Sequence, residues 1–123
     1  MAHNFRNLEV WKRAMSVAKQ VYVLTRQFPA DEKFGMTSQI QRAAVSIASN
    51  IAEGAGRGSC KDFAHFLNIA LGSAFEVETQ VLLSKDLGYA NDEDCNKVIE
   101  ELHVIQPQLN ALIKNYGDTE IEK

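Results

Sequence analysis

Apolar residues recur along this chain with the period of an α-helix. Four stretches, at residues 7–27, 38–54, 60–87 and 92–116, place them three or four positions apart, so that each stretch has one apolar face. No stretch longer than a few residues alternates between apolar and polar as a half-buried strand does. The pattern therefore predicts an all-α protein built from amphipathic helices.

The same periods predict which residues face the core. They are Leu8, Trp11, Met15, Ala18, Tyr22 and Thr25 in the first helix; Ile40, Ala44, Ile47 and Ile51 in the second; Phe63, Phe66, Leu67, Ala70, Ala74, Val77, Val81 and Ser84 in the third; and Cys95, Val98, Leu102, Ile105, Leu109, Leu112 and Tyr116 in the fourth. Short connections favour an up-down-up-down antiparallel four-helix bundle, with residues 1–123 forming a single domain. We expect residues 117–123 to form an acidic, frayed tail.

Local signals mark the expected ends of the helices. Pro29 ends the first helix, because proline disfavours helical geometry in the residue before it, and Thr37 is the expected N-cap of the second helix. Ser59 followed by Asp62 fits the capping pattern at the start of the third helix. Gly88 is the expected C-terminal stop of that helix.

A glycine-rich segment, Gly54-Ala55-Gly56-Arg57-Gly58, separates the second helix from the third. A dinucleotide fingerprint or a Walker loop needs a strand before it and a different glycine spacing, so nucleotide-dependent catalysis is disfavoured. The segment is typical of a helix stop and start that needs backbone freedom. Arg57 and Lys61 flank the start of the third helix, which leaves phosphate contact at this corner as the weaker alternative.

Charge is distributed unevenly along the chain. The 123 residues have a net charge of −3, but residues 1–30 hold five Lys or Arg against one acid, whereas residues 91–123 hold three Lys against eight acids. A protein that is basic throughout is therefore not indicated, and a local basic face is the form that nucleic-acid binding would take. The candidate phosphate contacts are Arg6, Lys12, Arg13, Lys19, Arg26, Arg57 and Lys61. For the row of Lys12, Lys19 and Arg26, spaced by seven residues, a solvated flank of an amphipathic helix is the alternative.

Several kinds of site and location are disfavoured. The two cysteines, Cys60 and Cys95, have no second Cys or His at ligand spacing, so we expect reduced structural thiols. No window approaches the ~18 apolar residues of a membrane span, and the N-terminus lacks the apolar region of a signal peptide. The sequence therefore predicts a soluble cytoplasmic protein that does not enter a membrane.

Metal-dependent and nucleophilic catalysis also find little support. Asp62 and His65, and likewise Glu100 and His103, have the acid-x-x-His spacing of a di-metal centre in a bundle. At about 100° per residue, His65 and Glu100 point away from the core directions of their helices, which argues against such a centre. No serine or cysteine has a recognisable base beside it. We expect a non-enzyme without cofactors.

Polar rows and surplus apolar surface suggest helix or subunit contacts. The polar rows are Arg42, Ser46, Asn50 and Glu53 on the second helix and Ser73, Glu76 and Gln80 on the third. They are either solvated faces or contacts made through small residues and paired hydrogen bonds. The third helix also carries apolar residues outside its core face, which favours self-association; the alternative is that the longest helix is simply the most central. The candidate interface residues are Arg42, Ser46, Asn50, Glu53, Leu71, Gly72, Ser73, Phe75, Glu76, Gln80 and Leu82, with Ile69 and Leu83 as further apolar positions.

The string FPADEKFGMTSQIQRAAVSIASNIAEGAGRGS, followed by FLNIALGSAFEVETQ, resembles the bacterial four-helix-bundle family that includes proteins encoded within intervening sequences of 23S ribosomal RNA genes. The resemblance begins at Leu8-Glu9-Val10-Trp11, continues through the third helix and weakens in the fourth. The matching marks are Phe28-Pro29, Glu32, Gln39, the segment from Ser46 to Gly54, Gly72-Ser73 and Glu76.

The resemblance implies a small bundle that assembles into a homopentamer. It also implies kinship with the accessory protein of diversity-generating retroelements, whose pentamer binds nucleic acid and a reverse transcriptase. That relative is strongly basic, whereas this chain has a net charge of −3, so its candidate contacts are limited to the first helix, Arg57 and Lys61. Two hypotheses follow: a scaffold associated with RNA or DNA, and a protein-interaction module that recognises a partner chain without nucleic acid.

Overall fold

The computed structural model describes the backbone of residues 4–121 and the side chains of residues 4–117. The main helices are α1 (Glu9–Leu24), α2 (Met36–Ala55), α3 (Cys60–Asp86) and α4 (Asp92–Ile121). Short 3-10 helices are η1 (Phe5–Asn7), η2 (Thr25–Gln27) and η3 (Ala30–Glu32). No strand occurs within residues 4–121, so the predicted all-α class is confirmed.

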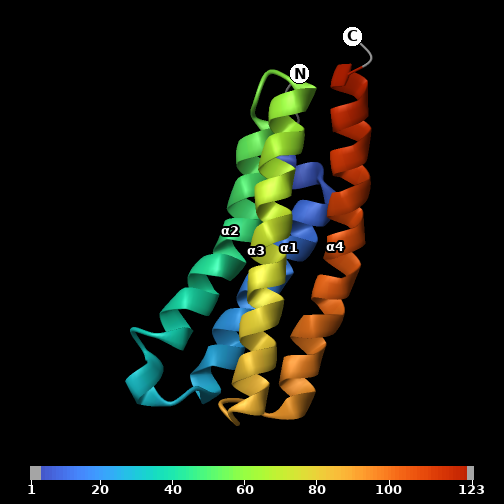
Figure 1. Ribbon diagram of the computed structural model, residues 1–123. Coiled ribbons are helices and arrows are strands. Elements are labelled where there is room, and N and C mark those ends of the chain that lie inside the picture. The colour runs from blue at the N-terminus through green and yellow to red at the C-terminus, as the bar shows by residue number, and fades with distance from the viewer. Residues whose placement is uncertain (1–3, 122–123) are drawn as a thin grey trace.

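Successive helices run in opposite directions and form the predicted up-down-up-down four-helix bundle (Figure 1). α1 packs against α2 and α4, and α3 packs against the same two helices. α1 and α3 therefore occupy diagonally opposite corners of the bundle. Their outward faces consequently lie on opposite sides of the molecule.

α3 begins and ends at the capping signals that the sequence contains. The Ser59 side chain accepts a hydrogen bond from the Asp62 N–H at 3.1 Å, as an N-cap does. At the other end Gly88 has a φ of 74°, and the Tyr89 N–H donates to the Ser84 carbonyl at 2.9 Å. This is the hydrogen-bond pattern of a Schellman C-cap, which requires a left-handed residue at position 88.

The ends of α1 and α2 differ from the prediction. α1 ends at Leu24, because residues 25–27 tighten into a 3-10 helix before the proline. α2 begins at Met36, one residue before the predicted N-cap Thr37. The Met36 N–H donates to Glu32 Oε1 at 3.0 Å, so a carboxylate from the preceding turn satisfies the helix start in place of a threonine hydroxyl.

α4 is longer than the sequence predicts. The helix continues through Gly117 to Ile121, where the prediction has a frayed tail. The ring of Tyr116 packs on the ring of Phe63 with centroids 4.6 Å apart, which ties the last turns of α4 to α3. The final part of the predicted tail, residues 122 and 123, lies outside the described residues.

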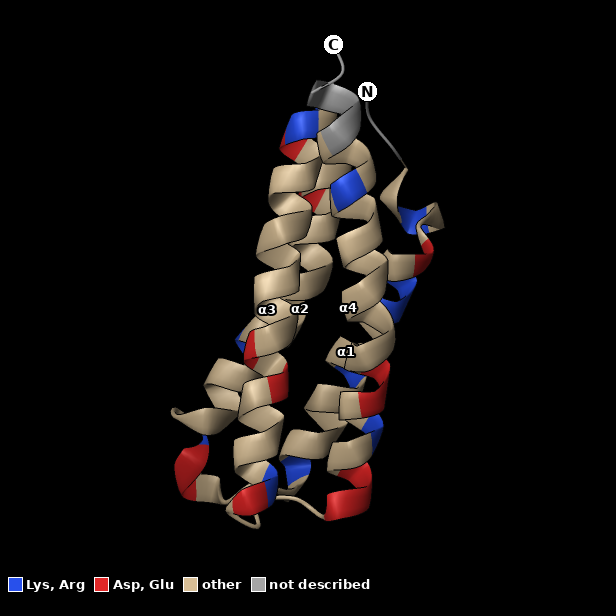
Figure 2. Cartoon of the chain, turned by 45° about the vertical axis from the view of Figure 1, so that its right-hand side comes forward, with Lys and Arg blue, Asp and Glu red and all other residues tan. Residues whose placement is uncertain are grey.

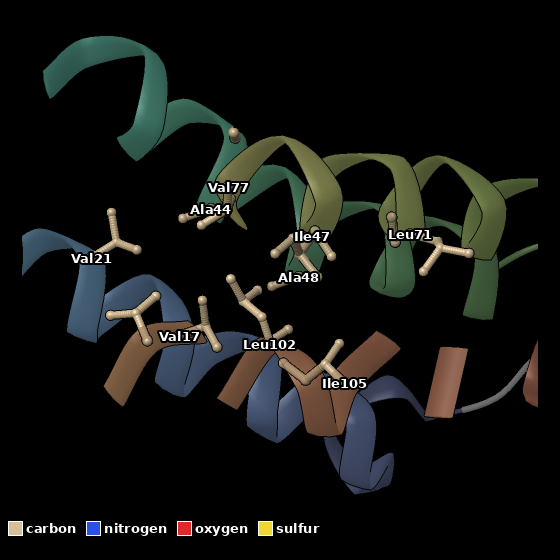
Figure 3. Close-up of a cluster of buried hydrophobic side chains, with 14 of the residues drawn as sticks. Val17, Val21, Ala44, Ile47, Ala48, Leu71, Val77, Leu102 and Ile105 are labelled. Carbon is tan, nitrogen blue, oxygen red and sulfur yellow. The ribbon is translucent and has the colours of Figure 1, made fainter. Parts of the chain in front are cut away.

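The hydrophobic core lies along the bundle axis and draws on all four helices. Val17 and Val21 of α1, Ile47 of α2, Val77 of α3 and Leu102 of α4 have no exposed surface, and their side chains converge between the ribbons (Figure 3). In α2, α3 and α4 most of the predicted core residues are buried, whereas Phe66, Leu112 and Tyr116 are only partly buried. The packing of these faces accounts for the bundle.

α1 buries a different face from the predicted one. Its buried residues are Val10, Ala14, Val17, Val21 and Leu24. Of the residues predicted to face the core, Trp11, Met15 and Ala18 are only partly buried, and Tyr22 is 48% exposed. Both sets repeat with helical spacing at positions about 100° apart, so periodicity alone does not choose between them. The predicted face instead forms an apolar strip beside α2.

Candidate nucleic-acid and subunit interfaces

The basic row of the first helix is the first candidate site. Lys12 and Lys19 are exposed on α1, and Arg26 is exposed in η2. Figure 2 shows basic segments recurring along α1, whereas acidic segments gather at the end of the bundle where α3 passes to α4. Because η2 is a 3-10 helix, Arg26 leaves the α-helical register of the two lysines. The row therefore consists of two aligned cations and a third beyond the end of α1.

Of two other predicted phosphate contacts, Arg13 has a role within the fold and Arg6 is exposed. Arg13 Nη1 lies 3.2 Å from Glu101 Oε1, and Arg13 Nε lies 3.2 Å from Glu9 Oε2. The Arg13 side chain thus joins α1 to α4 instead of standing free for a phosphate. Arg6 lies in η1, with its guanidinium 6.0 Å from the centroid of the Phe5 ring.

The corner between α2 and α3 holds the remaining candidate cations. Arg57 forms an ion pair with Glu53 at 2.8 Å, and its guanidinium lies 4.7 Å from the centroid of the Phe66 ring. This pairing and stacking hold the arginine along the corner. Lys61 is exposed in the first turn of α3. The corner therefore presents cations, but the charge of Arg57 is already partly compensated.

Close helix packing, and not backbone freedom, explains the first glycine of this corner. Gly54 is buried inside α2, and among the described residues only Gly88 has a positive φ. A Cβ at position 54 would lie 2.7 Å from the Phe66 Cβ and 3.0 Å from the Phe63 Cδ1. The expectation of a φ-driven helix stop at Gly54 is therefore wrong: α2 and α3 approach too closely there for a side chain.

The polar rows of α2 and α3 meet inside the chain. The hydroxyl oxygens of Ser46 and Ser73 lie 2.9 Å apart, and the Asn50 Nδ2 donates to the Ser46 carbonyl at 2.8 Å and to its hydroxyl at 2.9 Å. Gln80 donates from Nε2 to Glu76 Oε2 at 3.3 Å. Ser46, Asn50 and Ser73 thus form a helix–helix contact, in which small hydroxyl side chains allow α2 and α3 to approach.

The other interface candidates divide into buried and exposed residues. Leu71 is only 9% exposed and belongs to the core, so its assignment to a subunit surface is wrong. Phe75 and Leu82 are 49% and 43% exposed. Gly72 and Arg42 are also exposed. The apolar surface available to a partner on α3 therefore centres on Phe75 and Leu82, together with Ile69 and Leu83, which are 40% and 46% exposed.

A polar cluster between α3 and α4 has no counterpart among the predicted sites. Gln106 Nε2 donates to Glu78 Oε1 at 2.7 Å, and His103 Nε2 lies 2.9 Å from Glu78 Oε2. The hydrogen bond from Gln106, followed by that from His103, lowers the pKa of the Glu78 carboxyl. No sequence signal indicates this cluster, because its members come from different helices.

Acidification is expected to remove the contribution of Glu78 to stability. Its pKa in the folded chain lies below the reference value of 4.5. The stabilisation is therefore fully present above that unfolded value and is lost as the pH falls through the folded pKa. At neutral pH the Glu78→Gln variant should be less stable than the wild type by on the order of 1 kcal/mol, and in strong acid the two should converge.

Urea unfolding at neutral and strongly acidic pH measures this difference. Glu100→Gln is the matched control, because Glu100 is exposed on α4, and it should change stability little at either pH. A gap between wild type and Glu78→Gln that persists in strong acid would contradict the assignment.

At one end of the bundle, side-chain contacts join the α1–α2 connection to the turn between α3 and α4. The Tyr89 hydroxyl donates to Glu32 Oε2 at 3.1 Å, and the rings of Phe28 and Tyr89 lie 5.7 Å apart. Gln27 Nε2 donates to Asp94 Oδ2 at 2.7 Å. Phe28 and Glu32, which the sequence marks only by resemblance, therefore anchor the α1–α2 connection to the turn between α3 and α4.

The two cysteines and the residues considered for a metal site do not form a cluster among the described residues. Cys60 and Cys95 are both buried and free, and burial raises the pKa of the Cys95 thiol. His65 and Glu100 are exposed, and no group of three or more His, Cys, Asp or Glu side chains is placed to hold a metal ion within the described part of the chain. None of the helices described for this chain combines the length and apolar character needed to cross a membrane.

Comparison with known proteins relates the fold to one family. Residues 6–111 match the family model for the 23S rRNA-intervening sequence protein. The chain is also similar to the crystal structure of a protein with unknown function from the S23 ribosomal protein family from Bacteroides thetaiotaomicron, with 30% identity and a TM-score of 0.79. That similarity covers 85% of this chain and 98% of the other. No curated protein matches the chain.

Proposed function

Because this chain belongs to the family of 23S rRNA-intervening sequence proteins, we propose that it is a non-catalytic, self-assembling bundle that acts as a cytoplasmic scaffold for RNA or DNA. The observation that carries the proposal is the exposed basic row of Lys12, Lys19 and Arg26. No ion pair engages these three side chains within the described part of the chain. They are therefore available to neutralise phosphates.

The position of the charges matters more here than their sum. The net charge of −3 opposes phosphate binding at long range. However, acidic segments gather near the α3–α4 turn, while basic segments follow α1 (Figure 2). Salt screens charges beyond about 10 Å, so a nucleic-acid backbone lying along α1 interacts with the basic row and with the acids nearest to it, such as Asp94, which lines a pocket with Lys19. This distribution supports local, salt-sensitive binding.

Self-assembly is supported by the apolar surface that one chain leaves exposed. The residues are Tyr22 on α1, Val45 on α2, and Ile69, Phe75, Leu82 and Leu83 on α3, each at least 40% exposed. Large contiguous apolar patches are uncommon on monomers, and four of these residues belong to the single helix α3. The homopentamer implied by the sequence resemblance is the assembly that we propose.

A structural use of the polar side chains supports the non-catalytic part of the proposal. The Ser46–Ser73 hydrogen bond joins α2 to α3, Asn50 donates to Ser46 within α2, and Glu78 holds two side chains of α4. Neither cluster has the nucleophile, base and orienting group of a covalent catalyst. Both instead hold neighbouring helices together.

Removing the basic row is expected to weaken binding and its dependence on salt. In a Lys12→Ala/Lys19→Ala/Arg26→Ala variant, up to three phosphate contacts are lost. The slope of log K against log salt concentration should then fall in magnitude by about 2 to 3. Fluorescence anisotropy with labelled structured RNA and duplex DNA, titrated at several salt concentrations, measures the slope.

A matched triple variant controls for the change in net charge. Lys33, Lys97 and Lys114 are exposed and lie outside the basic row, so their replacement by alanine removes the same number of charges. This control should alter the slope much less. Absence of salt-sensitive binding by the wild type, or equal slopes for the two triple variants, would refute the nucleic-acid part of the proposal.

A second candidate function is a protein-interaction module that binds no nucleic acid. The observation that favours it is Phe34, which is 89% exposed in the connection before α2. An aromatic side chain presented in this way is typical of an anchor that enters a partner's pocket. Wild-type protein on a resin should then retain a protein from cell extract that a Phe34→Ser variant does not retain. Retention by both proteins, or by neither, would count against this function.

A further inference from the structure

A cavity opens between α1 and α4, which pack side by side (Figure 2). We call "the α1–α4 pocket" this cavity, which is lined by Lys19, Gln20, Val23 and Leu24 of α1 with Lys97 and Val98 of α4. Residues three to four positions apart lie on one face of a helix, so each helix contributes one wall. The volume is about 330 Å³, and cavities of about 300–1,000 Å³ hold small organic ligands. The pocket is therefore large enough for a small molecule.

Hydrogen bonds join the two walls beyond both ends of the pocket. Arg13 Nη1 donates to Glu101 Oε1 at 3.2 Å, about one turn from the lining residues on each helix. In the opposite direction along α1, Gln27 Nε2 donates to Asp94 Oδ2 at 2.7 Å. Because these contacts fix the spacing of α1 and α4 on either side, the pocket exists without a ligand. A ligand then binds without having to order its own site.

The interior of the pocket is mainly apolar. Leu24 and Val98 are each only 2% exposed and form its floor, whereas Val23 is 54% exposed and lies at its mouth. Gln20 Oε1 is buried without a hydrogen-bond partner among the residues whose side chains the structure describes. The walls therefore suit the apolar body of a ligand, and the Gln20 amide has unused hydrogen-bonding capacity beside it.

Two lysines stand at the mouth of the pocket, one from each helix. Lys19 is exposed and forms no ion pair with the side chains described for residues 4–117. Lys97 lies 3.7 Å from Glu93, but these side chains are 64% and 82% exposed, so the pair contributes little and is easily exchanged. Both ammonium groups are therefore available to an anion.

One acid, Asp94, also lines the pocket. Its Oδ2 accepts hydrogen bonds from Gln27 at 2.7 Å and from Asn91 at 2.9 Å. The hydrogen bond from Gln27, followed by that from Asn91, lowers the pKa of the Asp94 carboxyl, so the group stays ionised and engaged by these amides. Two lysines against one engaged aspartate leave the mouth net positive and selective for an anion.

From these features we propose that the α1–α4 pocket binds a small carboxylic acid with an apolar body. The carboxylate lies between Lys19 and Lys97, and the hydrocarbon part lies on Leu24 and Val98. This ligand site goes beyond the proposed function and does not depend on it. Because Lys19 also belongs to the basic row, a bound carboxylate occupies one of the three cations proposed to contact phosphate.

Titration of the full chain with octanoate tests the site, and isothermal titration calorimetry measures the affinity. A ligand of about ten non-hydrogen atoms should bind with a dissociation constant of about 0.1–1 mM. In methyl NMR spectra the signals of Val23, Leu24 and Val98 should shift, whereas those of Val45 and Val104, which lie outside the pocket, should not. Octylammonium has the same hydrocarbon chain and the opposite charge, so it should bind at least about tenfold more weakly.

A Lys19→Gln/Lys97→Gln variant tests the two cations. Both residues are exposed, so the variant should fold, which circular dichroism verifies, and it should bind octanoate at least about tenfold more weakly than the wild type. Lys33→Gln/Lys114→Gln is the matched control, because these lysines are exposed outside the pocket. It removes the same charge and should change the affinity by less than about twofold.

Three results would overturn the site. They are no binding of octanoate to the wild type at about 10 mM, equal affinity for octylammonium, and equal affinity of the two double variants for octanoate. The titration contains no nucleic acid. Its failure would therefore remove the ligand site and leave the outcome of the salt-slope measurement unchanged.

Discussion

Gly54→Ala is expected to lower the free energy of unfolding, although alanine is the better helix former. The added Cβ would meet the Phe66 Cβ at 2.7 Å and the Phe63 carbonyl oxygen at 3.3 Å, so α2 and α3 would have to separate. Overpacking of this kind costs about 1–3 kcal/mol, and the gain in helix propensity offsets up to about 1 kcal/mol. A net loss of about 1–2 kcal/mol should appear in urea unfolding followed by circular dichroism.

Gly72→Ala is the matched control, because it makes the same substitution within a helix where a Cβ meets no atom within 4 Å. At position 72 only the helix propensity changes, and we expect the free energy of unfolding to rise by up to about 1 kcal/mol. The two variants should therefore change stability in opposite directions. An increase in stability for Gly54→Ala would show that α2 and α3 are not as close at this point as the structure places them.

Val21→Ala is expected to lower the free energy of unfolding by about 2–3 kcal/mol. Val21 has no exposed surface and lies among the side chains of the bundle axis (Figure 3). Truncation removes two buried carbon groups at about 0.8 kcal/mol each and leaves a cavity that the surrounding helices fill only in part. The unfolding midpoint should fall accordingly in both thermal and urea denaturation.

Val23→Ala provides the control on the same helix. Val23 is 54% exposed, so the same truncation should change the free energy of unfolding by at most about 0.5 kcal/mol. This pair also tests which face α1 buries. Equal losses, or a larger loss at Val23, would mean that α1 is rotated from the orientation described above.

The orientation of α1 shows the limit of reasoning from apolar periodicity. Around this helix the sequence offers two apolar strips, one containing Trp11 and Tyr22 and the other containing Val17 and Val21. The aromatic strip has the larger side chains, and the sequence therefore predicts that this strip faces the core. In the bundle the smaller valines fit the space left by three other helices, and the bulky strip remains at the edge. Which face of α1 is buried therefore depends on the volume of the core that all four helices share, and the sequence of one helix does not contain that information.

The candidate contacts show a related limit. Lys12 and Lys19 are exposed, as a charged flank of an amphipathic helix should be. Arg13 belongs to the same helix, yet it is held by Glu101, which lies 88 positions away in the sequence. Spacing within one helix predicts which side chains point outward. It does not predict which of them find a partner on another helix.

The sequence by itself determines the all-α class, the four helices and the cap of α3, because helical periodicity and capping are local and depend on residues a few positions apart. The tertiary structure alone decides the buried face of α1, the close approach at Gly54, the Ser46–Ser73 contact and the cluster around Glu78. These features depend on distances between helices, and such distances are set by how all the side chains of the core fill one shared volume.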